Sequence, residues 1–140
     1  MLGAVGGASP FVVVGGAGAA GAGCAGAASF CAAARYLGVP YRWGGASPAG
    51  FDCSGLVMYV YAQIGIALPH YTVTQYRMGV AVTRDRLQPG DLVFFDGLGH
   101  VGIYIGAGQF IHAPHTGDVV KVSSLSESWY ASTYVGARRI

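Results

Sequence analysis

The apolar residues of the chain change their spacing after about residue 88. Before that point they recur at helical intervals. Residues 25–37 place them on one helical face, and a Gly-Val-Pro sequence follows. Residues 53–64 are apolar on nearly all sides, which is typical of a helix buried in a small domain. The pattern therefore predicts two helices in the first half of the chain.

Short β-branched or aromatic runs follow the Gln-Pro-Gly-Asp turn signature of residues 88–91. Most of them are separated by glycine-bearing turns, as antiparallel neighbours would be. We expect strands at residues 92–95, 100–105, 109–113, 119–122 and 134–140. Helices that precede a series of strands predict the α+β class, with the helices packed on an antiparallel sheet of five or six strands.

The first 27 residues are mostly Gly and Ala, without a charged side chain. They lack the basic start of a signal peptide and the strongly apolar residues of a membrane-spanning helix. We interpret residues 1–27 as a leader or linker and residues 28–140 as one domain, because 140 residues can bury only one core.

Charged residues make up only 10% of the chain, and the formal net charge is +2. The basic residues are scattered, apart from the Arg138–Arg139 pair, so no surface follows a phosphate backbone and we expect no nucleic-acid partner. The hydrophobic fraction of 53% excludes a disordered chain. We expect a compact monomer without a membrane span.

Three cysteines cannot all pair with one another. Cys24 and Cys31 are seven residues apart in an Ala-rich stretch with helical character, which would separate them by roughly 10 Å along the helix axis. A disulfide needs Cα atoms within about 7 Å. We therefore expect two small buried apolar residues without a bridge between them.

Cys53 occupies a setting that favours a nucleophile. Asp52 is a good helix N-cap, so Cys53 would be the first helical residue, where free N–H groups and the helix dipole stabilise a thiolate. Such a position can lower a cysteine pKa from about 8.5 to roughly 3.5–7.5, and the same N–H groups can stabilise an oxyanion. A cysteine that only packs in the core is more common, so Cys53 alone does not decide the function.

His100 and His112 flank a predicted hairpin. In the register that pairs Ile105 with Gln109, they are diagonal neighbours about 7 to 8 Å apart. A second register also places the two histidines on one face of the sheet. In that register they lie directly opposite each other, about 5 Å apart. A slip of one residue would place them on opposite faces.

The combination of Cys53 with this histidine pair predicts catalysis by a cysteine nucleophile. His100 would act as the base, and His112 would orient it. A zinc site is the alternative, because cysteine and histidine are zinc ligands. Only His112 and His115 are close in sequence, however, and their odd offset on a strand would point them to opposite faces. We expect neither a metal nor a cofactor.

Four sequence blocks together resemble the NlpC-type, papain-like peptidoglycan endopeptidases, in family order and from about residue 28 to the C-terminus. The blocks are Gly38–Gly45 (GVPYRWGG), Phe51–Leu56 (FDCSGL), Gln88–Phe95 (QPGDLVFF) and His100–Tyr104 (HVGIY). Residues 68–71 (LPHY) and 75–76 (QY) look closest to the actinobacterial cell-wall hydrolases.

The resemblance implies a papain-like fold and hydrolysis of the amide between D-γ-glutamate and meso-diaminopimelate, or an equivalent dibasic residue, in peptidoglycan stem peptides. It carries over Cys53 as nucleophile, His100 as base and His112 as the third polar residue. The third position varies in the family, and the actinobacterial branch is expected to have Glu there. An exported protein, extracellular or in the cell wall, is also implied.

The resemblance further places Tyr41 as a substrate or oxyanion contact, and Asp52 and Ser54 as contacts to a substrate amine. Each also has a structural explanation: loop packing for Tyr41, and an N-cap and a first-turn residue for the other two. Two other functions stay open, a wall-binding module without turnover and another thiol reaction, such as acyl transfer or amide hydrolysis at a different bond.

Overall fold

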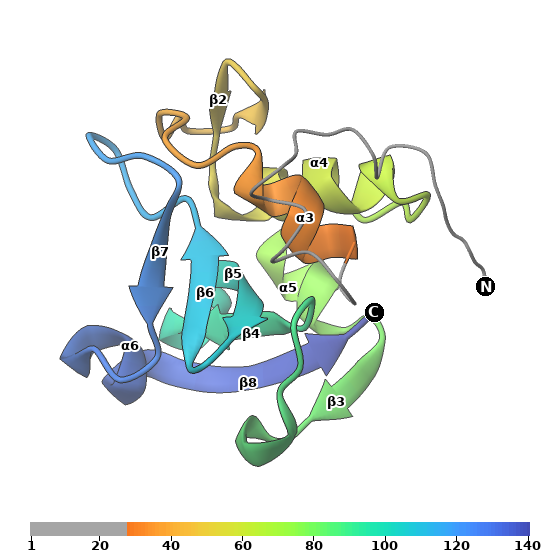
Figure 1. Cartoon of the computed structure of the whole chain (residues 1–140), viewed down its shortest axis with the longest axis vertical. Coiled ribbons are helices and arrows are strands. Elements are labelled where there is room, and N and C mark those ends of the chain that lie inside the picture. The colour runs from red at the N-terminus through yellow and green to blue at the C-terminus, as the bar shows by residue number, and fades with distance from the viewer. Residues whose placement is uncertain (1–27) are drawn as a thin grey trace.

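The computed structural model describes residues 28–140, which form helices on the two faces of an antiparallel sheet (Figure 1). The proposed leader, residues 1–27, lies outside the described residues. The helical elements are α3 (Ala28–Ala34), α4 (Cys53–Gln63), α5 (Thr72–Tyr76), α6 (Ser128–Thr133) and the 3-10 turns η1 (Arg84–Arg86) and η2 (Asp96–Leu98). The strands are β1 (Ala46–Ser47), β2 (Gly50–Phe51), β3 (Val80–Val82), β4 (Leu92–Phe95), β5 (His100–Gly106), β6 (Gln109–His112), β7 (Lys121–Ser124) and β8 (Tyr134–Arg139).

The six-stranded sheet has the order β3-β8-β4-β5-β6-β7, and all its pairs are antiparallel. This confirms the α+β class and the six-stranded alternative. The bounds predicted for β4 are correct. The strand predicted at residues 119–122 begins instead at Lys121, because Val119 forms a bridge with Pro40 in the loop before β1. The edge strand β3 was not predicted, since its side chains are largely exposed and lack an apolar alternation.

Both faces of the sheet are buried, and strand alternation divides the core between them. Along β4, Leu92 and Phe94 join the cluster under α3 and α4, whereas Val93 and Phe95 join a second cluster on the opposite face. The ring of Tyr130 from α6 packs against Phe95 on that second face. The central strand is therefore apolar at every position, as its sequence is.

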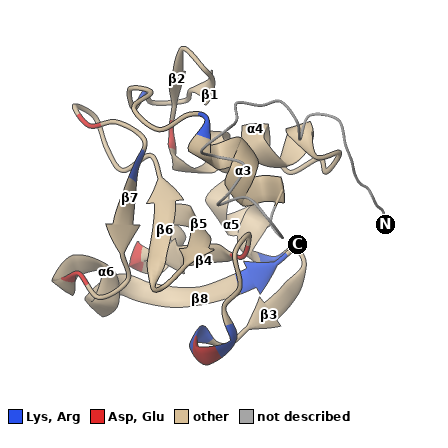
Figure 2. Cartoon of the chain, viewed as in Figure 1, with Lys and Arg blue, Asp and Glu red and all other residues tan. Residues whose placement is uncertain are grey.

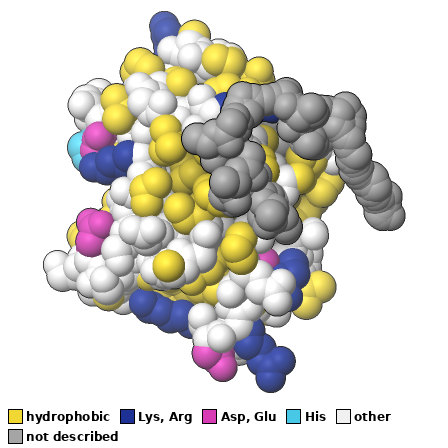
Figure 3. Space-filling view, viewed as in Figure 1, with side chains coloured by type: hydrophobic (Ala, Val, Ile, Leu, Met, Phe, Trp, Pro, Cys, Tyr) yellow, Lys and Arg dark blue, Asp and Glu magenta, His cyan; other side chains and the backbone are white. Residues whose placement is uncertain are grey.

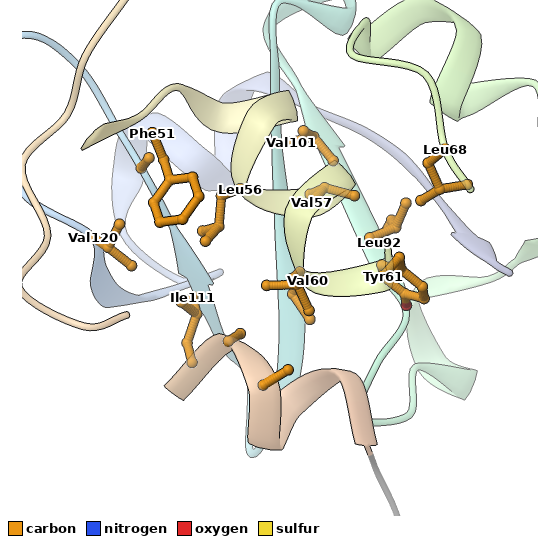
Figure 4. Close-up of a cluster of buried hydrophobic side chains, with 14 of the residues drawn as sticks. Phe51, Leu56, Val57, Val60, Tyr61, Leu68, Leu92, Val101, Ile111 and Val120 are labelled. Atoms are coloured by element: carbon orange, nitrogen blue, oxygen red, sulfur yellow. The ribbon is translucent and has the colours of Figure 1, made fainter. Parts of the chain in front are cut away.

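Helix α4 packs against β5 of the sheet and also against α3, which explains why it is apolar on nearly all sides. Figure 4 shows Leu56, Val57 and Val60 directed into the core, and all three are fully buried. Each such side chain contributes about 1.5–3 kcal/mol when it leaves water. This packing holds the N-terminal end of α4, where Cys53 lies, against the sheet.

The first helix is shorter than predicted, and the prediction about its cysteine is wrong. Helix α3 spans Ala28–Ala34, and turns replace the expected helix over residues 35–37. Cys31 is disulfide-bonded. Cys24 lies outside the described residues. The prediction assumed that one helix carries both cysteines, whereas the structure describes this helix only over Ala28–Ala34.

The β5–β6 register agrees with the diagonal prediction. Ile103 pairs with Ile111, and a bulge near the turn makes Gly106, rather than Ile105, the partner of Gln109. The same register sets Gly102 across from His112. A Cβ atom at Gly102 would lie 3.2 Å from the Cβ of His112, so a glycine leaves room for the histidine.

The close approach at Gly102 generates a stability prediction. A Cβ there would also lie 2.6 Å from a ring carbon of Phe110. Gly102→Ala should therefore lower the free energy of unfolding by about 1–3 kcal/mol through overpacking, as measured by urea denaturation. Val80→Ala, at an exposed position of β3, should change it by less than about 0.5 kcal/mol. Equal effects of the two substitutions would contradict the close packing.

Candidate active site

Cys53 is the first residue of α4, and the predicted N-cap is confirmed. The N–H group of Gly55 donates to Oδ1 of Asp52 at 2.7 Å, and the N–H of Gly44 donates to Oδ2 at 3.1 Å. The carboxylate thus joins the helix start to the preceding loop. Gly55 is needed at this contact, since a Cβ there would meet the carbonyl oxygen of Gly45.

The thiol of Cys53 is partly buried and surrounded by hydrogen-bond donors. Its sulfur lies 3.9 Å from Oγ1 of Thr72. Burial raises the pKa of the Cys53 thiol, whereas the Thr72 hydroxyl and the N–H groups of Val101 and Ser54 lower it, and the net direction is upward. The expectation of a lowered pKa is therefore wrong in the resting site, because loss of hydration outweighs the donors.

A chain of hydrogen bonds runs away from His100 across the sheet. Nε2 of His100 lies 2.7 Å from Nδ1 of His112, and Nε2 of His112 lies 2.8 Å from Oγ of Ser123. All three side chains are buried, and His112 is fully so. Since Nε2 of His100 is occupied by His112, Nδ1 is the nitrogen left for another partner.

Burial keeps both histidines neutral. Burial, followed by the charge of His115, lowers the pKa of His100 to about 4. Burial, followed by the charge of His100 itself, lowers the pKa of His112 to about 2. With a thiol whose pKa is raised, the resting site holds a neutral thiol and neutral imidazoles rather than an ion pair.

Tyr130 of α6 covers the histidine pair. Its ring stacks on that of His100 with 6.3 Å between centroids and meets the ring of His112 edge-on at 5.3 Å. A hydrogen bond with Ser123 lowers the pKa of the Tyr130 hydroxyl, although burial leaves that pKa raised overall. Thr72, Ser123 and Tyr130 were not predicted as site residues, because they come from separate elements without a motif.

Tyr41 lies at the helical side of the site, in a bridge with Phe51. Burial raises the pKa of its phenol, and the charges of Cys53 and Asp52 raise it further. Ser54 is buried in the first turn of α4, and its carbonyl oxygen accepts from Nε2 of Gln75 at 3.1 Å. The structure thus gathers Tyr41, Asp52 and Ser54 around Cys53.

His70 was not singled out from the sequence, yet it forms a hydrogen bond with Asp52. Its Nε2 lies 2.7 Å from Oδ1 of Asp52, and both side chains are partly exposed. The carboxylate therefore accepts hydrogen bonds from His70 and from two backbone N–H groups. The hydrogen bonds from the backbone N–H groups establish the structural role of Asp52 as an N-cap.

Within residues 28–140, no three His, Cys, Asp or Glu side chains lie close enough to hold a metal ion. Over the same residues, no helix has the length and apolar character needed to cross a membrane. Charged side chains are few and dispersed along the fold (Figure 2), and the face shown in Figure 3 has them scattered rather than gathered in one patch.

The fold and the site together define a class. A cysteine at the N-terminus of a buried helix, close to the start of a strand that bears a histidine, with a polar residue on the next strand, is the arrangement of papain-like cysteine–histidine domains. The model of the NlpC/P60 family matches residues 38–139, and the chain belongs to that family.

Individual relatives support the assignment. The chain is 47% identical over 113 residues to murein DD-endopeptidase MepH of Escherichia coli K12, which covers 74% of the chain and 42% of MepH. It is 44% identical over 110 residues to the gamma-D-glutamyl-L-lysine dipeptidyl-peptidase of Bacillus cereus, covering 74% of the chain and 33% of that enzyme. The chain thus spans less than half the length of these curated relatives.

A solved structure shares the fold over nearly its whole length. The crystal structure of the NlpC/p60 domain of peptidoglycan hydrolase SagA superposes with a TM-score of 0.74 at 42% sequence identity. The match covers 82% of this chain and 98% of that domain.

The neutral histidines make stability depend on pH. Both have lowered pKa values when folded, to about 4 and about 2, so their contribution is complete above the unfolded pKa of about 6.5 and is lost as pH falls. Between about pH 6.5 and 5, the free energy of unfolding should fall by up to about 1.4 kcal/mol per pH unit for each histidine. Urea denaturation at several pH values measures this slope.

His112→Gln should remove about half of the slope, because one of the two buried imidazoles no longer titrates. The matched control is His115→Gln, since this side chain is 74% exposed. A wild-type stability that does not change between pH 6.5 and 5 would contradict the buried neutral pair.

Proposed function

We propose that this domain is a cysteine endopeptidase that hydrolyses the D-γ-glutamyl amide to meso-diaminopimelate, or to an equivalent dibasic residue, in peptidoglycan stem peptides. The observation that carries the proposal is the 2.7 Å hydrogen bond between Nε2 of His100 and Nδ1 of His112, which leaves Nδ1 of His100 for a proton. The N–H of the next residue, Val101, donates to the Cys53 thiol. The names of its relatives, a murein endopeptidase and a gamma-D-glutamyl-L-lysine dipeptidyl-peptidase, support this substrate class.

In the first step, the sulfur of Cys53 attacks the scissile carbonyl carbon as Nδ1 of His100 takes the thiol proton. A neutral starting pair suits this order, because the base is unprotonated at neutral pH. The carbonyl π electrons move to oxygen, and N–H groups at the start of α4 stabilise the resulting oxyanion. The proton stays on His100, since the pKa of His112 is lower still.

In the second step, the oxyanion collapses and the amide C–N bond breaks. The imidazolium of His100 gives its proton to the leaving amine, and a thioester on Cys53 remains. Water then attacks the thioester with His100 again as base. The thiolate that leaves regains the proton, so one water is consumed for one acid and one amine released.

The hydrogen-bond chain sets the tautomers that this role requires. For Nδ1 of His100 to accept a proton, its Nε2 carries hydrogen and donates to Nδ1 of His112. The hydrogen of His112 is then on Nε2, which donates to the hydroxyl of Ser123. Ser123 is therefore a positioning residue in this proposal, two hydrogen bonds from the base.

Substrate contacts are proposed on the helical side. The charge of Cys53 contributes to the raised pKa of the Tyr41 phenol, which supports its hydroxyl as a contact to the substrate or the oxyanion. The carboxylate of Asp52, although occupied by backbone N–H groups and His70, supplies negative charge that attracts a substrate amine. Ser54 borders the same region. An exported monomer that acts outside the cell or in its wall completes the proposal.

The first functional prediction concerns the nucleophile. Cys53→Ala should abolish cleavage of a purified stem tetrapeptide while the circular dichroism spectrum stays unchanged, because only one small side chain is lost. Mass spectrometry should show wild-type products separated between D-γ-glutamate and diaminopimelate. Turnover by the alanine variant would refute the mechanism. If the folded, reduced wild type has no activity, the result would favour a wall-binding module. If it breaks the peptide at a different bond, the result would favour another thiol reaction.

The second functional prediction concerns Ser123. Ser123→Ala leaves Nε2–H of His112 without its acceptor, which favours the tautomer that cannot receive a hydrogen bond from His100. The value of kcat/KM should fall by about tenfold to a hundredfold, less than the whole contribution of a general base. Ser124→Ala, which alters an exposed hydrogen bond on the same strand, should have little effect.

Nitrogen-15 NMR of the imidazoles separates this role from a structural one. The wild type should show both rings with hydrogen on Nε2, and Ser123→Ala should show a mixture of tautomers at His112. Unchanged tautomers together with reduced activity would contradict the positioning role.

A further inference from the structure

A cavity of about 490 Å³ opens on the sheet side of the site. His100, the proposed base, is one of the residues that line it. Trp129 and Tyr130 line it from α6, and His115 from the loop after β6. The remaining contributions include Asp96 of η2 and Glu127 at the start of α6. None of the residues that carry the proposed helical-side contacts lines this cavity.

We propose that this cavity is the leaving-group subsite, and that Glu127 and Asp96 bind the second amino group of a dibasic leaving residue. The proposal rests on the proposed function. His100 must hand its proton to the leaving amine from the same nitrogen that received it from the thiol, so the leaving residue lies beside this imidazole. His100 also lines the cavity, which can therefore receive the side chain of that residue.

The charge of the cavity selects the ligand class. Two carboxylates line it and no Lys or Arg does, so its acidic side chains outnumber its permanently basic ones. Both Asp96 and Glu127 are exposed at its surface, and Figure 2 shows acidic positions next to α6 and at the end of β4. The second amine of a lysine or diaminopimelate side chain is a cation at neutral pH and matches this charge.

The shape of the cavity suits the stem of such a side chain. Trp129 is 49% exposed and stands edge-on to Tyr130 at 5.1 Å, so it presents apolar surface beside Glu127. Methylene groups can pack on the indole while the terminal amine reaches the carboxylates. Oε2 of Glu127 accepts the N–H of Ser124 at 2.9 Å, which orients its carboxylate.

The experiment compares two substrates that differ in one amine: L-alanyl-γ-D-glutamyl-L-lysine and the same peptide ending in L-norleucine. Wild-type protein should prefer the lysine peptide by about fivefold or more in kcat/KM, the value of one partly exposed ion pair. In Glu127→Gln and in the double variant with Asp96→Asn, this ratio should fall toward one. Gln at 127 keeps an oxygen that can accept the Ser124 hydrogen bond.

The matched control is Asp85→Asn, which removes an exposed carboxylate from η1 and should leave the ratio unchanged. A wild type that cleaves both peptides equally well, or a double variant that keeps the lysine preference, would overturn the subsite. If folded wild type with a reduced thiol cleaves neither peptide, the proposed function fails first, and the subsite falls with it.

Binding supplies a readout that does not need turnover. In Cys53→Ala, the released product L-lysine should shift the indole N–H signal of Trp129 at lower concentration than L-norleucine does. Adding Glu127→Gln should remove this difference. If L-lysine and L-norleucine shift the Trp129 signal at the same concentration in the variant that retains Glu127, recognition of the amine would be contradicted.

Discussion

The hydrogen bond between His100 and His112 depends on the pairing of β5 with β6, and the rest of the site depends on that bond. The register makes the two histidines diagonal neighbours and sets Gly102 across from His112, where a larger side chain would displace the imidazole. The packing of α4 against the same strand brings Cys53 to Val101, the residue after His100. A single strand therefore carries the proposed base and contacts the proposed nucleophile.

Burial gives this site its electrostatic character. It raises the pKa of the Cys53 thiol and lowers the pKa values of His100 and His112, so each group favours its neutral form. In the proposed mechanism, the hydrogen bond to Ser123 sets which nitrogen of His112 carries hydrogen. In the proposed mechanism, charge develops only when the substrate is in place, where the N-terminus of α4 can stabilise it.

The two faces of the sheet divide the proposed recognition of the substrate. The helical side carries Tyr41 and Asp52 beside the thiol, and the α6 side carries a cavity with two carboxylates beside the base. Membership of the NlpC/P60 family is consistent with this division, because the fold positions one cysteine and one histidine between two separately built surfaces. Differences in α6 and the loop before it can then alter the leaving-group side without disturbing the nucleophile.

The sequence alone determined the features that local periodicity and motif spacing control. These include the α+β class, the bounds of β4, the N-cap Asp52 ahead of Cys53, and the common face of His100 and His112, because strand alternation and helix capping act over a few residues. Tertiary structure decided what depends on contacts between distant segments. The diagonal register, the burial that reverses the expected pKa shift, the disulfide of Cys31, and the meeting of Ser123, Tyr130 and Glu127 near His100 all required the packed fold, since no local pattern encodes how β7 and α6 close over the sheet.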